Sequence, residues 1–189
     1  MRILSSDNPA RRTALCGLLL CLALIFSYLE ARLPLLFLPI PGFKLGFANL
    51  VIALTAYVIS LPAAAVISVL RVLITSVLFG SLTSFWFSLL GAIYAFAAMA
   101  LLLRFARKSV SPLGVSVASA AAHNAGQLTA ASLLLSPAVM SYTPVLLLAA
   151  LITGSITGVI LRQLLASIHS VPIPHTNRDR ESPSQKGTP

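Results

Sequence analysis

Long apolar runs without charged residues, separated by short charged segments, dominate the pattern of this chain. The uncharged runs cover residues 13–29, 45–70, 72–103 and 109–161. A membrane-spanning helix needs about 20 mostly apolar residues, so the last three runs are long enough for more than one crossing. Proline, glycine and serine interrupt these runs and disfavour a continuous helix. The pattern predicts six helices, over residues 13–29, 45–60, 63–79, 84–103, 113–135 and 143–166.

Six such helices predict an all-α membrane protein, a bundle of six transmembrane helices. Residues 1–12 are expected to form a cytoplasmic N-terminal tail, and residues 13–166 the transmembrane domain. Residues 167–189 are expected to form a disordered cytoplasmic tail, because this segment is too polar to bury a core. The longest connection, from Glu30 to Lys44, mixes prolines with bulky apolar residues, which predicts a segment that dips into the membrane interface or covers a site.

The composition excludes a water-soluble globular domain. Of the 189 residues, 58% are hydrophobic and 9% are charged, and the mean hydropathy is +0.95. The net charge is +9. The basic residues nevertheless form no stripe or aromatic-interleaved patch suited to nucleic acid, so nucleic acid is not an expected partner.

Lysine and arginine instead mark the cytoplasmic side of the protein, as the positive-inside rule describes. With six spans, the N-terminal tail, the fourth connection and the C-terminal tail lie on one side of the membrane. Both termini are therefore expected in the cytoplasm. The basic residues of the three segments are Arg2, Arg11, Arg12, Arg104, Arg107, Lys108, Arg162, Arg178, Arg180 and Lys186.

Acidic residues and cysteines offer little for catalysis or metal binding. The four acidic residues are Asp7, Glu30, Asp179 and Glu181. Only Glu30 lies near the apolar body, so chemistry with paired carboxylates or a carboxylate-bound metal is not expected. Cys16 and Cys21 are about 140° apart around a helix, which predicts small core residues rather than a disulfide or a metal site. No catalytic residue, metal site or cofactor is predicted.

Polar residues inside the predicted spans are the candidates for a binding site, because an ionisable group in mid-span costs about 2.5 to 3.5 kcal/mol. Arg71 lies near the middle of the third helix, too deep to reach the cytoplasmic surface easily. In the fifth helix, His123, Asn124 and Gln127 fall within an arc of about 100° among small residues. The alternatives are a structural anchor for Arg71 and interhelical hydrogen bonds for the other three.

Three further polar residues extend this set toward the outer face. Lys44 stands at the outer boundary of the second helix, Asn49 about one turn deeper, and Glu30 at the outer end of the first helix. This asymmetry predicts an outward cavity, and the excess positive charge favours an anionic ligand. The alternatives are that Lys44 is an interfacial anchor and that Glu30 pairs with Arg71 or Lys44. The expected substrate-binding residues are Glu30, Lys44, Asn49, Arg71, His123, Asn124 and Gln127.

Small residues at helical spacing predict close helix packing. They occur as Thr13-Gly17-Cys21 in the first helix and as Ala150-Gly154-Gly158 in the sixth. Both stripes are interpreted mainly as packing surfaces within the bundle. The alternative for the first stripe, which Ala10 and Ala14 extend, is a surface that docks a partner protein.

Three motifs resemble a known family. They are Pro41-Gly42-Phe43-Lys44-Leu45-Gly46-Phe47-Ala48-Asn49, Leu70-Arg71-Val72-Leu73 with Phe79-Gly80, and Ala122-His123-Asn124-Ala125-Gly126-Gln127. From about residue 13 to 165 the chain resembles the Gx transporter family, also catalogued as heptaprenyl diphosphate synthase component I. That family is similar to the substrate-binding S components of energy-coupling factor (ECF) transporters. The resemblance implies six helices, cytoplasmic termini and an outer pocket covered by the first loop.

The two family names imply different functions. The first hypothesis is a bacterial membrane substrate-binding or transport protein that takes a small anionic metabolite from the outer face. It would need ECF-type ATPase and coupling subunits, because the chain has no P-loop. The alternative is a non-catalytic membrane component of a heptaprenyl diphosphate synthase, because the chain lacks aspartate-rich motifs that hold magnesium on a diphosphate. The protein itself is not expected to be an enzyme, since His123 has no paired nucleophile or acid.

Overall fold

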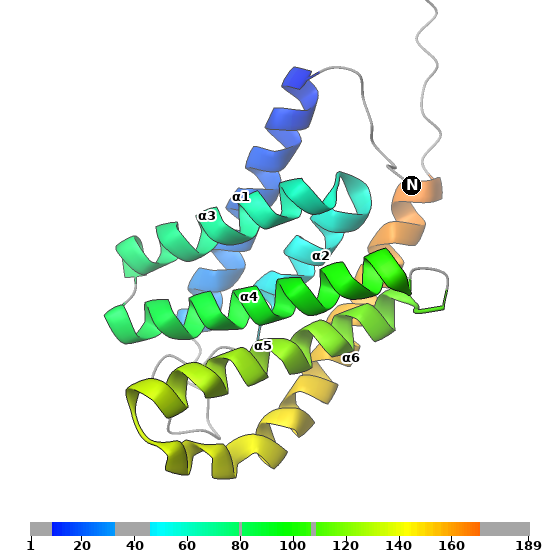
Figure 1. Ribbon diagram of the computed structural model, residues 1–189. Helices are drawn as coiled ribbons and strands as arrows, with labels where there is room; N and C mark the ends of the chain where they lie inside the picture. The colour runs from blue at the N-terminus through cyan, green and yellow to red at the C-terminus, as the bar shows by residue number, and fades with distance from the viewer. Residues whose placement is uncertain (1–8, 33–45, 80, 107–108, 171–189) are drawn as a thin grey trace, which may run out of the picture.

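The structure, a computed structural model, describes residues 9–32, 46–79, 81–106 and 109–170 (Figure 1). Within these ranges the regular structure is all helical. The elements are α1 (Pro9–Arg32), α2 (Ala48–Val58), α3 (Leu61–Phe79), α4 (Leu82–Phe105), α5 (Pro112–Leu134), the 3-10 helix η1 (Pro137–Tyr142) and α6 (Thr143–Ser170). The prediction of an all-α fold, with helices in this order, is confirmed.

Serine side chains start three elements at the breaks that the sequence predicted. Ser81 accepts a hydrogen bond from the backbone N–H of Ser84 (3.1 Å) at the start of α4. Ser111 accepts one from Gly114 (3.2 Å) at the start of α5, and Ser136 caps η1 in the same way. Each hydroxyl satisfies an amide that has no partner inside its helix. The serine and proline breaks of the sequence are therefore helix starts.

Helix α2 is shorter than the predicted helix over residues 45–60. Its 11 residues give a length of about 16 Å, whereas the hydrocarbon core of a membrane is about 30 Å thick. Gly46 has a φ of +88°, a left-handed conformation that keeps the helix from extending backward. At the other end, the N–H groups of Ile59 and Ser60 both donate to the carbonyl of Thr55, which closes the helix before α3 begins. The predicted bounds are wrong at both ends.

The first and last helices are longer than predicted. Helix α1 begins at Pro9 and ends at Arg32 instead of covering residues 13–29. Helix α6 continues to Ser170, four residues beyond the predicted end at residue 166. The prediction stopped at the edges of the apolar runs, whereas the helical backbone continues into the flanking polar residues.

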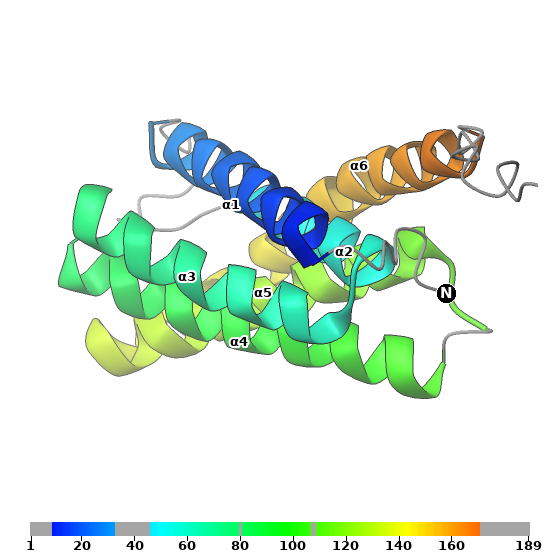
Figure 2. The same cartoon turned by 90° about the horizontal axis from the view of Figure 1, so that it is seen from above.

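Helices α3, α4 and α5 lie side by side in one layer, and α1 and α6 cross this layer (Figure 1, Figure 2). Helix α2 lies between α1 and α6 and contacts all five of the other α-helices. Packing is most extensive between α4 and α5 and between α5 and α6. The central position of α2 explains its composition, because a helix surrounded by other helices is apolar on all sides.

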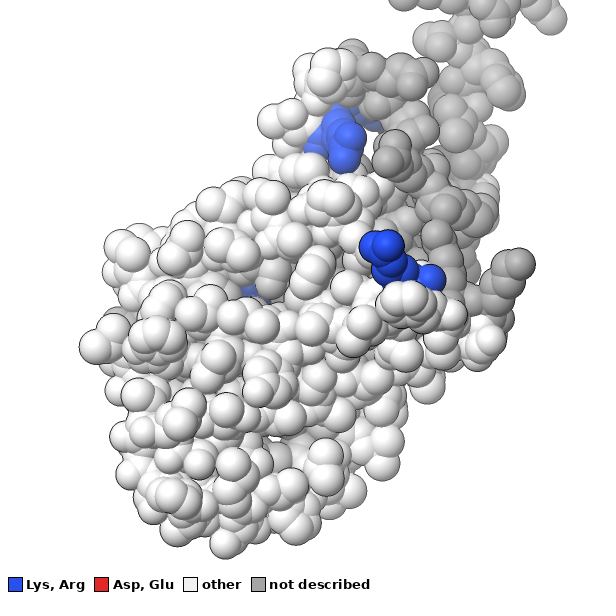
Figure 3. All heavy atoms as spheres, in the orientation of Figure 1, with Lys and Arg blue, Asp and Glu red and all other residues white. Residues whose placement is uncertain are grey.

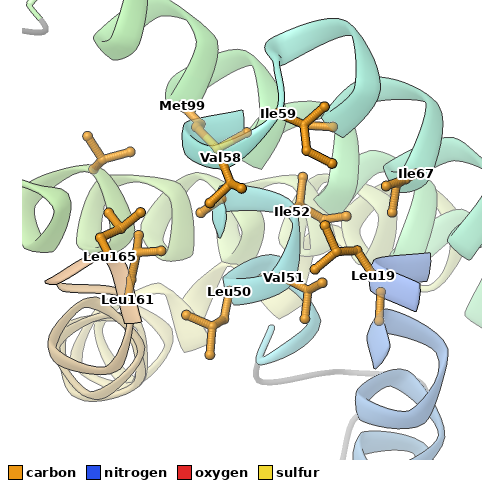
Figure 4. Packing of buried hydrophobic residues seen from close by; sticks show 14 residues of the cluster. Leu19, Leu50, Val51, Ile52, Val58, Ile59, Ile67, Met99, Leu161 and Leu165 are labelled. Atoms are coloured by element: carbon orange, nitrogen blue, oxygen red, sulfur yellow. The ribbon is translucent and has the colours of Figure 1, made fainter. Parts of the chain in front are cut away.

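The main apolar core forms around α2. Leu50, Val51 and Ile52 of α2 are all buried. Figure 4 shows them between Leu19 of α1 and Leu161 of α6, with Ile67 of α3 and Met99 of α4 completing the cluster. The short helix therefore joins the α1–α3 side of the molecule to the α5–α6 side.

Large apolar side chains cover the outer surface. Val77 is 86% exposed and Leu133 76%. Four segments of the described chain are long and apolar enough to cross a membrane: Pro9–Arg32, Leu61–Leu78, Leu82–Phe105 and Pro137–Ile168. A helical protein with such a surface is a membrane protein, because lipid rather than water suits these side chains.

Basic side chains gather at one end of the helices. Arg12 in α1 donates from Nη2 to the hydroxyl of Ser60, 3.2 Å away, and so joins the start of α1 to the turn between α2 and α3. The visible basic surface lies mostly there and near the end of α4, with one small further basic patch on this face (Figure 3). This end of the bundle is the one that the sequence assigned to the cytoplasm.

The small residues of α6 pack against α5, as predicted. A Cβ atom added to Gly154 would lie 2.7 Å from the Cα of Val117, and one added to Gly158 would lie 2.9 Å from the Cα of Leu113. Such short distances leave no room for a side chain. The two glycines therefore let the backbones of α5 and α6 approach closely.

The small residues of α1 do not pack inside the bundle. A Cβ atom added to Gly17 would meet nothing within 4 Å, and Thr13 is exposed. Cys21 is also exposed, while Cys16 is partly buried. The interpretations of this stripe as a packing surface and of Cys21 as a core residue are wrong, because this side of α1 points away from the other helices.

Candidate functional site

Three of the predicted site residues lie buried on α5. His123 is 2% exposed, Asn124 4% and Gln127 0%. Ser119, one turn before His123, is also buried and donates to the carbonyl of Ala95 in α4 (3.1 Å). The polar side of α5 therefore faces the interior of the bundle, where unpaired polar groups are costly.

The imidazole of His123 lies in a space that two glycines leave open. A Cβ atom at Gly91 in α4 would lie 2.7 Å from Cε1 and 2.8 Å from Nδ1 of the ring. A Cβ atom at Gly46, just before α2, would lie 3.3 Å from Cδ2. Any larger residue at Gly91 would collide with the ring, so this position fixes where the imidazole lies. Gln127 is close by, with its Cγ 3.1 Å from the same added atom at Gly91.

Asn124 faces a different neighbour. Its Nδ2 donates to the backbone carbonyl of Leu146 in α6, at 2.8 Å. Its Oδ1 has no hydrogen-bond partner among the described residues. The three polar residues of α5 therefore diverge, since His123 and Gln127 lie toward α4 while Asn124 holds α5 to α6. This contact agrees with the alternative of an interhelical hydrogen bond.

Asn49 in α2 borders a narrow internal space. Its Nδ2 is buried, lacks a hydrogen-bond partner among the described residues, and would lie 3.2 Å from a Cβ atom at Gly46. The space is too narrow to admit a water molecule. Its lining consists of Asn49, Ile52, Ser68, Ala92, Ala95, Phe96, Met99 and Ser119. This space lies at the junction of α2, α3, α4 and α5, and both polar and apolar side chains line it.

Arg71 in α3 forms the centre of a second polar group. The side chain is 3% exposed, and its Nη1 donates to the hydroxyl of Ser27 in α1 at 3.4 Å. Nε and Nη2 have no hydrogen-bond partner among the described residues. A buried guanidinium with this little compensation is costly in a membrane and marks a place with a specific role.

Glu30 links the end of α1 to the start of α2. The carboxylate is 5% exposed, and its Oε1 accepts a hydrogen bond from the backbone N–H of Phe47, just before α2. Its negative charge acts on the guanidinium of Arg71. Of the predicted alternatives for Glu30, the structure supports a charge interaction with Arg71.

The predicted site residues therefore fall into two groups. Glu30 and Arg71 lie between α1 and α3, and His123 and Gln127 lie near Asn49 where α2, α4 and α5 meet. Lys44 and the first loop, which was expected to cover the site, lie outside the described residues. The first group offers charge, whereas the second offers neutral donors and acceptors.

Sequence reasoning missed Ser27, Ser119 and Gly91. The signal for Ser119 was present, because it stands one helical turn before His123 on the same side of α5. Ser27 stands one turn before Glu30 in α1, but its contact with Arg71 joins α1 and α3, which are far apart in sequence. Gly91 gave no signal, because its importance depends on the ring that approaches it from α5.

The described residues contain no group of three or more His, Cys, Asp or Glu side chains that could hold a metal ion. The described polar residues can form hydrogen bonds and charge interactions.

Comparison with known proteins gives one match. No curated protein and no solved structure is significantly similar to the chain. Residues 19–164 match the family described as heptaprenyl diphosphate synthase component I. The match covers most of the chain and includes all three motifs on which the resemblance was based. The chain therefore belongs to the heptaprenyl diphosphate synthase component I family.

Proposed function

We propose that this protein is the non-catalytic membrane component of a polyprenyl diphosphate synthase, and that a separate chain carries out the catalysis. Family membership is the observation that carries this proposal. It fits the sequence, because synthesis of a prenyl diphosphate needs metal-binding acidic clusters, and this chain has four acidic residues in all. The membrane component would hold the catalytic subunit near the lipid into which its long apolar product goes.

The proposed topology has six spans with both termini in the cytoplasm of a bacterial cell. The basic end of the bundle and the apolar outer surface support it. In this arrangement α2 and α5 pack against several other helices, so neither helix is exposed to lipid on all sides. Reporter fusions active only in the cytoplasm are expected to work at both termini. A C-terminal fusion that is active only outside would contradict the six-span arrangement.

The polar residues that the sequence singled out are the proposed ligand-binding part of this component. The set is Glu30, Lys44, Asn49, Arg71, His123, Asn124 and Gln127. Burial of most of them inside a membrane bundle supports this role, because polar residues in lipid usually line a site or a path.

A second candidate function is substrate binding or transport with an energising module. The observation in its favour is that Asn49, Arg71 and Asn124 keep buried polar atoms without hydrogen-bond partners among the described residues. A small anionic metabolite from the outer face would satisfy such atoms. The partners would then be ATPases and a coupling subunit in the manner of ECF transporters.

Purification from native membranes distinguishes the two functions. The tagged chain is extracted in mild detergent, and proteins that accompany it are identified by mass spectrometry, with an unrelated tagged membrane protein as control. We expect a soluble prenyl diphosphate synthase subunit to be enriched. Enrichment of an ATPase pair with a membrane coupling subunit would instead support the second candidate.

A further inference from the structure

The guanidinium of Arg71 has more hydrogen-bond donors than its surroundings satisfy. A guanidinium carries five N–H donors in a rigid plane. Among the described residues, Nη1 bonds to Ser27 at 3.4 Å, whereas Nε and Nη2 have no partner. The side chain is nevertheless 3% exposed, so water does not replace the missing partners. Such a group is costly unless something else binds it.

The chain itself offers little negative charge to balance Arg71. Glu30 is the only acidic residue between positions 8 and 178 of the sequence. One of its oxygens is already occupied by the backbone N–H of Phe47. Its negative charge acts on the guanidinium of Arg71, but Nε and Nη2 donate no hydrogen bond to its carboxylate. An anion from outside the chain would supply the acceptors that are missing.

The two unsatisfied nitrogens lie on the same edge of the guanidinium. In arginine, Nε–H and one N–H of Nη2 point in parallel, at the spacing of the two oxygens of a carboxylate or phosphate. The bond to Ser27 uses Nη1 and leaves this edge unoccupied. The arrangement matches bidentate recognition of an oxyanion, which a lysine ammonium cannot provide.

We propose that the Nε–Nη2 edge of Arg71 binds the oxyanion of a ligand between α1 and α3, with Ser27 holding the other side of the guanidinium. Glu30 balances the charge of Arg71 when the ligand is absent. The same edge fits the diphosphate of a prenyl lipid, a free phosphate compound or a carboxylate. The inference rests on the proposed function only for the choice of a prenyl diphosphate as one probe.

Ligand binding is measured on the purified chain in uncharged maltoside detergent, so that no lipid phosphate competes. The probes are farnesyl diphosphate, inorganic pyrophosphate and succinate, with farnesol as the uncharged control. At least one anionic probe is expected to bind, and Arg71→Gln is expected to weaken it about 100-fold. Arg71→Lys keeps the positive charge but loses the two parallel N–H donors, so we expect it to weaken binding of the probe about 10-fold. Arg104→Gln, at an exposed position of α4, serves as the matched control.

The probes separate the sources of the oxyanion. Binding of farnesyl diphosphate alone identifies a lipid-linked ligand, and binding of pyrophosphate or succinate identifies a soluble one. If none of the three binds, or if Arg104→Gln weakens binding as much as Arg71→Gln does, the proposal is overturned. The test uses the isolated chain, so its failure is distinguishable from failure to recover a synthase subunit from membranes.

A second variant keeps the test decisive if Arg71→Gln fails to fold. Glu30→Gln retains an oxygen that can accept from Phe47 but removes the charge that competes with the ligand for Arg71. It is expected to tighten binding of the anionic probe about 3-fold. Unchanged or weaker binding by a folded Glu30→Gln variant would mean that no anion meets Arg71, and would refute the site.

Discussion

Replacing Gly126 by alanine is expected to lower the melting temperature of the protein by about 5 °C. A Cβ atom at this position would lie 2.4 Å from the carbonyl oxygen of Leu90, 2.7 Å from its carbonyl carbon and 2.9 Å from the Cα of Gly91. All three atoms belong to the backbone of α4, so a change of rotamer cannot relieve the overlap. The two helices must move apart, and overpacking of this kind costs about 1 to 3 kcal/mol.

Two further glycines provide the comparison. Gly17→Ala meets nothing within 4 Å, so the better helix propensity of alanine is expected to leave the melting temperature unchanged or slightly raised. Gly154→Ala, 2.7 Å from the Cα of Val117, is expected to fall between the two. Thermal unfolding in detergent, followed by the fluorescence of Trp86, ranks the variants. Equal melting temperatures for Gly126→Ala and Gly17→Ala would contradict the close packing of α4 and α5.

Replacing Glu30 by leucine is expected to destabilise the protein by about 3 to 5 kcal/mol, the usual result of removing one partner from a buried charge pair. The change leaves Arg71 buried without its counter-charge and removes the acceptor for the N–H of Phe47. The amount of folded protein in the membrane fraction and its melting temperature in detergent measure the effect. Glu30→Gln separates the two losses, because it removes the charge but keeps an acceptor of the same length for the N–H of Phe47.

A double variant separates charge from packing. Glu30→Leu with Arg71→Leu removes both charges, and a buried charge pair replaced by apolar residues often costs little. We expect the double variant to recover most of the stability that Glu30→Leu loses. The remaining loss is that of the hydrogen bond from the N–H of Phe47 to the carboxylate of Glu30. A double variant as unstable as Glu30→Leu alone would show that the two charges are not coupled.

The helices followed from the sequence because their limits are local features. Apolar runs required helices, since backbone groups in lipid must bond within their own segment. Ser81, Ser111 and Ser136 marked helix starts, since each hydroxyl caps amides a few residues ahead in the same chain. The bounds of α1, α2 and α6 were exceptions, and α1 and α6 simply continue into flanking polar residues. A helix that is apolar on all sides has no polar face to mark its ends, so its bounds at Ala48 and Val58 did not show in the pattern.

The candidate site was only partly accessible from the sequence. Periodicity placed His123, Asn124 and Gln127 within one arc of α5, and the structure buries all three. The pattern could not tell that Asn124 bonds to Leu146 while His123 fits against Gly91, because these contacts join helices far apart in sequence. The error at Gly17 has the same cause. Small residues at helical spacing form the same sequence pattern whether they pack against another helix or face lipid.

The sequence by itself determined a helical membrane protein, the family to which it belongs and the identity of its few buried charges. These properties depend on composition, local spacing and motifs. Only the tertiary structure decided that Ser27 contacts Arg71, that α2 lies at the centre of the bundle, and which glycines make close contacts. The physical reason is that an apolar helix face fits lipid as well as it fits another helix. Hydrophobicity along the sequence therefore does not show which faces are buried inside the bundle.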